Sequence, residues 1–96
     1  MEKTYQKTYI ICNRYGLHIR PSTALTQLAG QYRCCITISN KGKTAKAGSI
    51  IELLALGTEC GEELIVKARG EDCQEAVEAV GRMIAARFGL SEESEE

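Results

Sequence analysis

The sequence of 96 residues has no tryptophan, one phenylalanine, one proline and one histidine. Its longest unbroken apolar stretches, such as Leu53 to Leu56, are far shorter than the roughly 20 residues that a bilayer-spanning helix needs. The N-terminal segment also has no apolar stretch followed by small residues, which a secretory signal would require. We therefore expect a cytoplasmic protein that does not insert into a membrane.

An excess of charge of either sign is also missing, because 12 Lys and Arg residues and 13 Asp and Glu residues give a net charge of −1. This excludes a strong electrostatic attraction to nucleic acid or to anionic membranes. The one basic cluster, from Lys41 to Lys46, favours a solvated hairpin, because nucleic-acid sites have larger basic surfaces with aromatic residues. The length predicts one domain over residues 1–90, followed by a flexible acidic tail over residues 91–96.

Cysteine is present, but without the spacing that a disulfide framework or a metal site requires. The count of 5 is odd and two of the residues are adjacent, which is awkward for disulfide pairing. No Cys-x-x-Cys pair occurs, so neither a metal nor a cofactor is predicted. We interpret all of the cysteines as reduced, partly buried thiols: Cys12, Cys34, Cys35, Cys60 and Cys73. The alternative, a thiol or metal protein, would reveal itself by stoichiometric metal after purification.

The first third of the chain predicts a strand, a turn and a helix. Residues 4–12 are rich in Thr, Tyr and Ile, as strands prefer, and residues 13–16 have turn chemistry. A helix is expected over residues 19–31, with Pro21 in its first turn, where a missing N–H costs nothing. The apolar positions that indicate it recur at i, i+3, i+4 and i+7: Leu25, Leu28, Ala29 and Tyr32.

The middle of the chain predicts a hairpin and a short helix. Residues 34–39 alternate, and after Asn40-Lys41-Gly42 a second extended segment follows over residues 43–47. Ser49, a preferred N-cap residue, then opens an apolar helix over residues 50–57 that ends at a glycine.

The last third of the chain completes the set of elements. Alternation indicates a strand over residues 64–69, and a helical period indicates a helix over residues 73–88. Four strands in one sheet, with helices on one face, is the economical arrangement and places the protein in the α+β class. The other face can remain in water, consistent with its polar positions: Thr37, Ser39, Lys67 and Arg69.

The candidate chemical site is Gly16-Leu17-His18-Ile19-Arg20-Pro21-Ser22, which places the only histidine at the start of a helix. The first turn of a helix has amides without intrahelical partners and about half a positive charge, so it favours a phosphate. Arg20 adds planar donors suited to phosphate. An uncharged imidazole keeps a nitrogen lone pair for attack on phosphorus. His18 is therefore a candidate phosphoryl acceptor, the alternative being an ordinary surface residue at a helix start.

The motif Gly16-Leu17-His18-x-Arg20-Pro21 resembles the phosphorylation signature of the HPr family, the phosphocarriers of the bacterial phosphoenolpyruvate-dependent sugar phosphotransferase system. The resemblance covers about residues 4–88 and includes Ser49-Ile50, Leu56-Gly57-Thr58 and Gly70-Glu71-Asp72. It implies an open-faced sandwich, with a four-stranded antiparallel sheet covered on one face by three helices. It also implies that His18 accepts a phosphoryl group on Nδ1 and that Arg20 steadies it, so the protein would be a carrier and not an enzyme.

The same resemblance assigns roles to the short helix. Ser49 lies at the regulatory phosphorylation site of the family, although a serine there is also simply a good N-cap. Ile51 and Leu54 lie on a face next to the one expected to be buried, and an apolar patch beside a reactive residue is typical of a docking site. The family docks partners there together with Arg20. Helical spacing alone leaves open that both apolar side chains are core residues.

The partners implied by the resemblance are enzyme I as phosphoryl donor and enzyme IIA proteins as acceptors. HPr kinase/phosphorylase and a transcriptional regulator are candidate further partners, and a monomer is expected. The alternative function is an HPr-like regulatory protein, of a nitrogen-related or serine-phosphorylated branch, that acts by protein–protein binding rather than in sugar uptake. A stand-alone enzyme is not expected, because so small a domain with one histidine offers no paired acid and base.

Overall fold

The computed structural model describes residues 3–89. Its sheet has the strand order β1-β4-β2-β3, and every neighbouring pair is antiparallel. The strands are β1 (Thr4–Ile10), β2 (Cys34–Asn40), β3 (Lys43–Lys46) and β4 (Glu63–Gly70). The described helices are α1 (Ile19–Ala29), α2 (Ile50–Ala55), α3 (Cys73–Ala85) and a short 3-10 turn, η1 (Arg87–Gly89).

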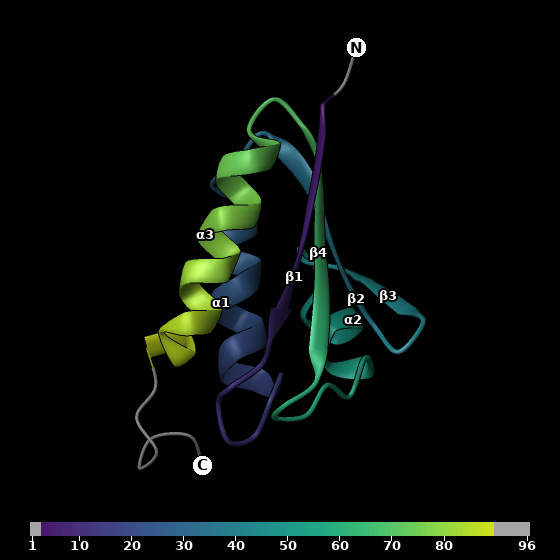
Figure 1. Ribbon diagram of the computed structural model, residues 1–96, viewed down its shortest axis with the longest axis vertical. Coiled ribbons are helices and arrows are strands. Elements are labelled where there is room, and N and C mark those ends of the chain that lie inside the picture. The colour runs from purple at the N-terminus through teal and green to yellow at the C-terminus, as the bar shows by residue number, and fades with distance from the viewer. Residues whose placement is uncertain (1–2, 90–96) are drawn as a thin grey trace.

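The alternation of buried and exposed residues along β4 explains why the helices lie on one face of the sheet (Figure 1). Leu64, Val66 and Ala68 are fully buried, while the residues between them are exposed. Side chains of a strand point alternately to its two faces, so one face of β4 is apolar and needs a cover. The prediction of an α+β open-faced sandwich is confirmed.

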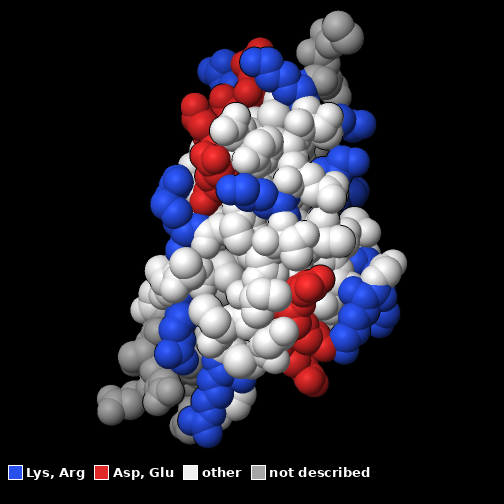
Figure 2. Space-filling view, in the orientation of Figure 1, with Lys and Arg blue, Asp and Glu red and all other residues white. Residues whose placement is uncertain are grey.

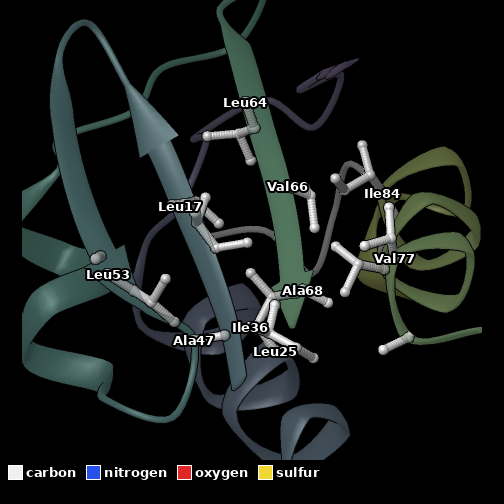
Figure 3. Close-up of a cluster of buried hydrophobic side chains, with 14 of the residues drawn as sticks. Leu17, Leu25, Ile36, Ala47, Leu53, Leu64, Val66, Ala68, Val77 and Ile84 are labelled. Atoms are coloured by element: carbon white, nitrogen blue, oxygen red, sulfur yellow. The ribbon is translucent and has the colours of Figure 1, made fainter. Parts of the chain in front are cut away.

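The core between the two layers contains residues from every α-helix (Figure 3). Leu25 of α1, Leu53 of α2 and Val77 of α3 are buried in one cluster with the sheet. Leu17, which directly precedes the candidate His18, belongs to the same cluster and is 3% exposed. Because burial of a side chain of this size contributes about 1.5–3 kcal/mol, the core fixes the segment that leads into α1.

Several predicted element ends differ from the observed ones. The strand predicted over residues 4–12 ends at Ile10, the helix predicted over 19–31 ends at Ala29, and the helix predicted over 50–57 ends at Ala55. The largest difference concerns the helix predicted over 73–88, which ends at Ala85. Arg87 and Phe88 have φ angles of 55° and 57°, in the left-handed region that an α-helix cannot contain. Phe88 nevertheless packs against the core, which is why its spacing resembled that of a helical residue.

The open face of the sheet is polar, and several cysteines are exposed. Lys67 and Arg69 are exposed on the uncovered face, as predicted. The cysteines are free, but the expectation of partly buried thiols is wrong for Cys12, Cys35 and Cys60, which are exposed. Cys35 lies on the open face of the sheet, and Cys12 and Cys60 lie in loops.

One acidic cluster lies at the end of the molecule that is away from the candidate site. Figure 2 shows acidic side chains gathered over the first turns of α3, where Glu71, Asp72, Glu75 and Glu78 line an open hollow. This end of the molecule lies opposite the start of α1 (Figure 1). No helix within residues 3–89 is long and apolar enough to cross a membrane. The predicted tail, residues 91–96, lies outside the described residues.

Candidate phosphoryl-acceptor site

Two loops meet at the end of the molecule where α1 begins (Figure 1). One loop joins β1 to α1 and the other joins α2 to β4. The amide of Leu17 in the first loop donates a hydrogen bond to the carbonyl oxygen of Thr58 in the second, at 3.0 Å. The sequence indicates Thr58 only as part of a motif, because a contact between residues this far apart leaves no local signal.

Glycine is required at position 16 for two reasons. The backbone of Gly16 has a φ of 62°, which costs a residue with a Cβ roughly 1–2 kcal/mol. A Cβ on Gly16 would also lie 2.0 Å from the carbonyl oxygen of Thr58, far inside van der Waals contact. The glycine of the motif therefore allows the two loops to approach closely enough to place His18.

His18 is the N-cap residue of α1, with φ −86° and ψ −169°, and its side chain makes no capping hydrogen bond. Its carbonyl oxygen accepts the first helical hydrogen bond, from the amide of Ser22 at 3.0 Å. The imidazole is thus held at the positive end of the helix, beside the amides of Ile19 and Arg20 that a helix leaves without intrahelical partners. Pro21 follows in the first turn, where it removes no helical hydrogen bond.

The two nitrogens of the His18 ring differ in their surroundings. Nε2 is buried and has no hydrogen-bond partner among the described residues. The ring of Tyr15 lies edge-to-face against the imidazole, with centroids 6.1 Å apart and an interplanar angle of 89°. The side chain as a whole is only partly buried, so a ring nitrogen that attacks phosphorus must be the one other than Nε2.

A buried asparagine that the sequence analysis missed shapes the loop before His18. Asn13 is 0% exposed, and its Nδ2 donates to the carbonyl oxygen of Gly16 at 2.7 Å. The amide of Gly16 in turn donates to the carbonyl oxygen of Asn13 at 3.2 Å, which closes the turn. The turn chemistry of residues 13–16 was the only signal in the sequence, and it did not distinguish this residue from an exposed turn asparagine.

Arg20 lies on the exposed first turn of α1, two positions after His18. The structure thus places the predicted phosphate-binding cation at the start of the helix that His18 caps. Ile19 between them is 65% exposed. The exposure of Ile19 has no signal in the sequence, because the burial of a single apolar position at a helix start cannot be inferred from spacing.

The short helix α2 packs against α1. Thr26 Oγ1 of α1 also donates to the carbonyl oxygen of Ala47, in the connection between β3 and α2, at 2.9 Å. Ile51 is 80% exposed and Leu54 is 37% exposed, whereas Leu53 is fully buried. The alternative that Ile51 and Leu54 are core residues is therefore wrong.

Ser49 caps α2 as its residue type predicts. Its Oγ accepts a hydrogen bond from the amide of Glu52 at 3.3 Å. The carboxylate of Glu52 accepts a hydrogen bond from the amide of Lys46 at 3.0 Å. The residue whose amide donates to the Ser49 hydroxyl thus also carries a carboxylate. Within the described residues, no group of three or more His, Cys, Asp or Glu side chains could hold a metal ion.

The open-faced sandwich is the fold of small phosphocarrier proteins whose structures are solved. The family profile described as "PTS HPr component phosphorylation site" matches residues 5–86. The chain belongs to this HPr family of the phosphotransferase system, whose members are phosphoryl carriers rather than catalysts.

Relatives from several branches of the family are similar to the chain. The phosphocarrier protein HPr of Cupriavidus necator is 38% identical over 87 residues, which cover 91% of this chain and 98% of that protein. The phosphocarrier protein NPr of Shewanella violacea is 35% identical over 86% of this chain and 91% of its own length. A multiphosphoryl transfer protein of Salmonella typhimurium is 38% identical over 84% of the chain, and the chain spans 22% of its length.

Solved structures support the same placement. A crystal structure of HPr from Thermoanaerobacter tengcongensis has a TM-score of 0.86 and 31% identity, covering 91% of this chain and 98% of that one. HPr from Bacillus anthracis has a TM-score of 0.81 and 30% identity, covering 84% of this chain and 96% of that one. At these identities the likeness extends from the fold to the family.

Proposed function

We propose that the chain accepts a phosphoryl group on His18 from phosphorylated enzyme I and passes it to enzyme IIA proteins. The observation that carries this proposal is the place of His18, whose imidazole stands at the N-terminus of α1 without a side-chain capping bond. The family profile, described by its phosphorylation site, spans this position. The multiphosphoryl transfer proteins among the relatives support a role in a phosphoryl relay.

The chemistry follows from the imidazole and the helix end. The Nδ1 lone pair of His18 attacks the phosphorus of a donor phosphohistidine, a new nitrogen–phosphorus bond forms, and the donor bond breaks with its electron pair returning to the donor ring. The amides at the start of α1 and the guanidinium of Arg20 stabilise the phosphoryl oxygens. Burial of Nε2 supports the choice of Nδ1, because the buried nitrogen is not reachable by a partner.

A carrier must also release the group that it accepts. Charge stabilisation at an exposed helix end contributes about 0.3–1 kcal/mol, and Arg20 is exposed as well. Such weak stabilisation suits a phosphoryl group that moves on, since tight binding of the phosphorylated form would only slow the next transfer.

The docking surface in this proposal consists of Arg20, Ile51 and Leu54. Two of these residues are apolar and exposed on α2, which packs against the helix that His18 caps. Exposed apolar side chains beside a reactive group are typical of a contact surface for partners. Arg20 in the same surface contributes both to docking and to the phosphoryl group.

Two branches of the phosphotransferase system are compatible with the relatives, since HPr and NPr proteins are 38% and 35% identical to the chain. We favour the sugar branch, and a nitrogen-related or regulatory protein is the alternative. A competition between enzyme I of the sugar system and its nitrogen-related counterpart separates them. The sugar branch predicts a kcat/KM at least about tenfold higher with the former, a difference that a few contacts provide, and the reverse ratio would establish the alternative.

Regulatory phosphorylation at Ser49 is a second proposal, with HPr kinase/phosphorylase and a transcriptional regulator as partners. A phosphate would add about −1.5 to −2 charge beside the docking surface and repel an anionic partner. Glu52, whose amide donates to the Ser49 hydroxyl, carries a negative charge three positions from it, so it disfavours the added charge. Incubation with the kinase and ATP should therefore phosphorylate Glu52→Gln faster than the wild type, and Ser49→Ala not at all. Modification that persists in Ser49→Ala would exclude this site.

The main proposal is tested by intact mass after incubation with enzyme I and phosphoenolpyruvate. The wild type should gain one phosphoryl group that is labile in acid and stable in base, as expected for a phosphorus–nitrogen bond. His18→Ala should gain none while keeping its melting temperature, because His18 makes no side-chain capping bond. A phosphoryl group on His18→Ala would place the acceptor elsewhere.

A further inference from the structure

Tyr15 makes a contact with His18 that the phosphoryl-transfer proposal does not use. The two rings are perpendicular, at 89°, with centroids 6.1 Å apart. Edge-to-face packing of this kind is an attractive arrangement with a preferred orientation. A contact with a preferred orientation restricts how the imidazole of His18 can turn.

The turning of this ring matters because a flip changes which side of the ring each nitrogen occupies. The last torsion of histidine is roughly two-fold, and a half turn moves Nδ1 to the place of Cδ2 and Nε2 to the place of Cε1. In the observed orientation Nε2 is buried without a partner. Something must therefore select this orientation over the flipped one, since a buried nitrogen without a hydrogen bond does not stabilise it.

Tyr15 is itself held on both sides. The guanidinium carbon of Arg14 lies 5.1 Å from the centroid of the Tyr15 ring, within the range of a cation–π contact. The turn that carries Tyr15 is closed by the hydrogen bond from Asn13 Nδ2 to the carbonyl oxygen of Gly16 at 2.7 Å. Tyr15 is 43% exposed, so the core does not fix its ring and these local contacts do.

We propose that Tyr15 is a positioning residue that holds the His18 imidazole with Nε2 covered and Nδ1 directed outward. This inference rests on the proposed function and deepens it, since it assigns the choice of the phosphorylated nitrogen to a residue outside the helix. Tyr15 touches neither phosphorus nor the attacking atom in this proposal. It acts through the ring of His18, whose proton stays on the covered Nε2 while Nδ1 attacks.

The inference is tested without any partner protein. Potassium phosphoramidate donates a phosphoryl group to exposed imidazoles, and phosphorus NMR separates the Nδ1 and Nε2 products. The wild type and Tyr15→Phe should give mainly the Nδ1 isomer, because both keep an aromatic ring. In Tyr15→Leu the ratio of the Nδ1 to the Nε2 product should fall about two- to tenfold, the range that loss of one aromatic pair produces. Arg14→Gln, which loosens Tyr15 without removing it, should cause a smaller fall.

A purely structural role for Tyr15 predicts a different result. It would lower the melting temperature of Tyr15→Leu and leave the isomer ratio unchanged, and that result would overturn the inference. The same variants are then incubated with enzyme I and phosphoenolpyruvate. A wild type that enzyme I fails to phosphorylate, but whose isomer ratio depends on Tyr15, would contradict the proposed function and leave the positioning role standing.

Discussion

The amide of Leu17 donates a 3.0 Å hydrogen bond to the carbonyl oxygen of Thr58, and both residues are 3% exposed. This contact joins the loop that carries His18 to the loop between α2 and β4. It means that the segment leading to His18 is part of the packed structure, because Leu17 lies in the core.

The first prediction concerns Gly16, which lies directly over this contact. Gly16→Ala should lower the free energy of unfolding by about 3–5 kcal/mol, because it combines a strained φ with an overlap against backbone atoms. Gly57→Ala is a matched control, since Gly57 also has a positive φ, 63°, but nothing within 4 Å of its added Cβ. The control should lose only about 1–2 kcal/mol. Equal losses in urea denaturation of the two variants would contradict the close approach.

The second prediction separates docking from stability on α2. Ile51→Ser should change the free energy of unfolding by less than about 0.5 kcal/mol, as expected of an exposed position. It should nevertheless lower kcat/KM for transfer from enzyme I by about 5- to 30-fold, the effect of losing 1–2 kcal/mol of contact. Leu53→Ala is the opposite control, because a buried leucine contributes about 2–5 kcal/mol to stability. Unchanged transfer with Ile51→Ser would remove Ile51 from the docking surface.

The third prediction concerns the ion pair that ties the hairpin to the loop before β4. Lys41 pairs with Glu62, and this hydrogen bond, with a second from the amide of Glu59, holds the pKa of Glu62 below its ordinary value. A lowered pKa in the folded state means that the pair stabilises the fold above the unfolded-state pKa of a glutamate, about 4.3. The stabilisation is lost as the pH falls through the pKa of folded Glu62.

Carboxyl NMR shifts measure this effect directly. Lys41→Met should raise the pKa of Glu62, while Lys43→Met, a change in the same hairpin at a lysine outside this ion pair, should leave it unchanged. A Glu62 titration that does not respond to Lys41→Met would show that the ion pair does not form in solution.

The fourth prediction compares the adjacent thiols Cys34 and Cys35. Burial raises the pKa of Cys34, and the nearby carboxylate of Asp72 raises it further, so the reactive thiolate is scarce at neutral pH. Cys35 is exposed on the open face of the sheet. The comparison uses iodoacetamide at pH 8 and two variants that each keep one of the two thiols. Cys34 in the Cys35→Ser variant should be alkylated more slowly than Cys35 in the Cys34→Ser variant. Asp72→Asn should speed the alkylation of Cys34. A Cys34 thiol that is alkylated faster than Cys35 in the wild type would contradict this ranking.

Most of the fold was predictable because local patterns agree with it. The alternation of Leu64, Val66 and Ala68 predicts a half-buried strand, and the sheet confirms it. Ser49 was predicted as an N-cap from its residue type alone, and its hydroxyl accepts the amide of Glu52. In each case a few neighbouring residues determine the local structure, so the sequence alone is enough to predict it.

The contacts that complete the site were not predictable for the opposite reason. Thr58 meets Leu17 only because two loops distant in the sequence are adjacent in the fold. The same limit applies to the end of α3, where Phe88 keeps the spacing of a helical residue but has a left-handed backbone. Apolar spacing reports which side chains reach the core, and a turn can place a side chain there as well as a helix can.

Carrier function is tested most directly by a chase experiment. The chain is phosphorylated with enzyme I and phosphoenolpyruvate, separated from both, and mixed with a panel of enzyme IIA proteins from the sugar and nitrogen-related branches. We predict that the phosphoryl mass leaves the chain and appears on at least one acceptor, and that Ile51→Ser slows this step. A phosphoryl group that stays on the chain with every acceptor, and is lost only by hydrolysis, would contradict a role as carrier.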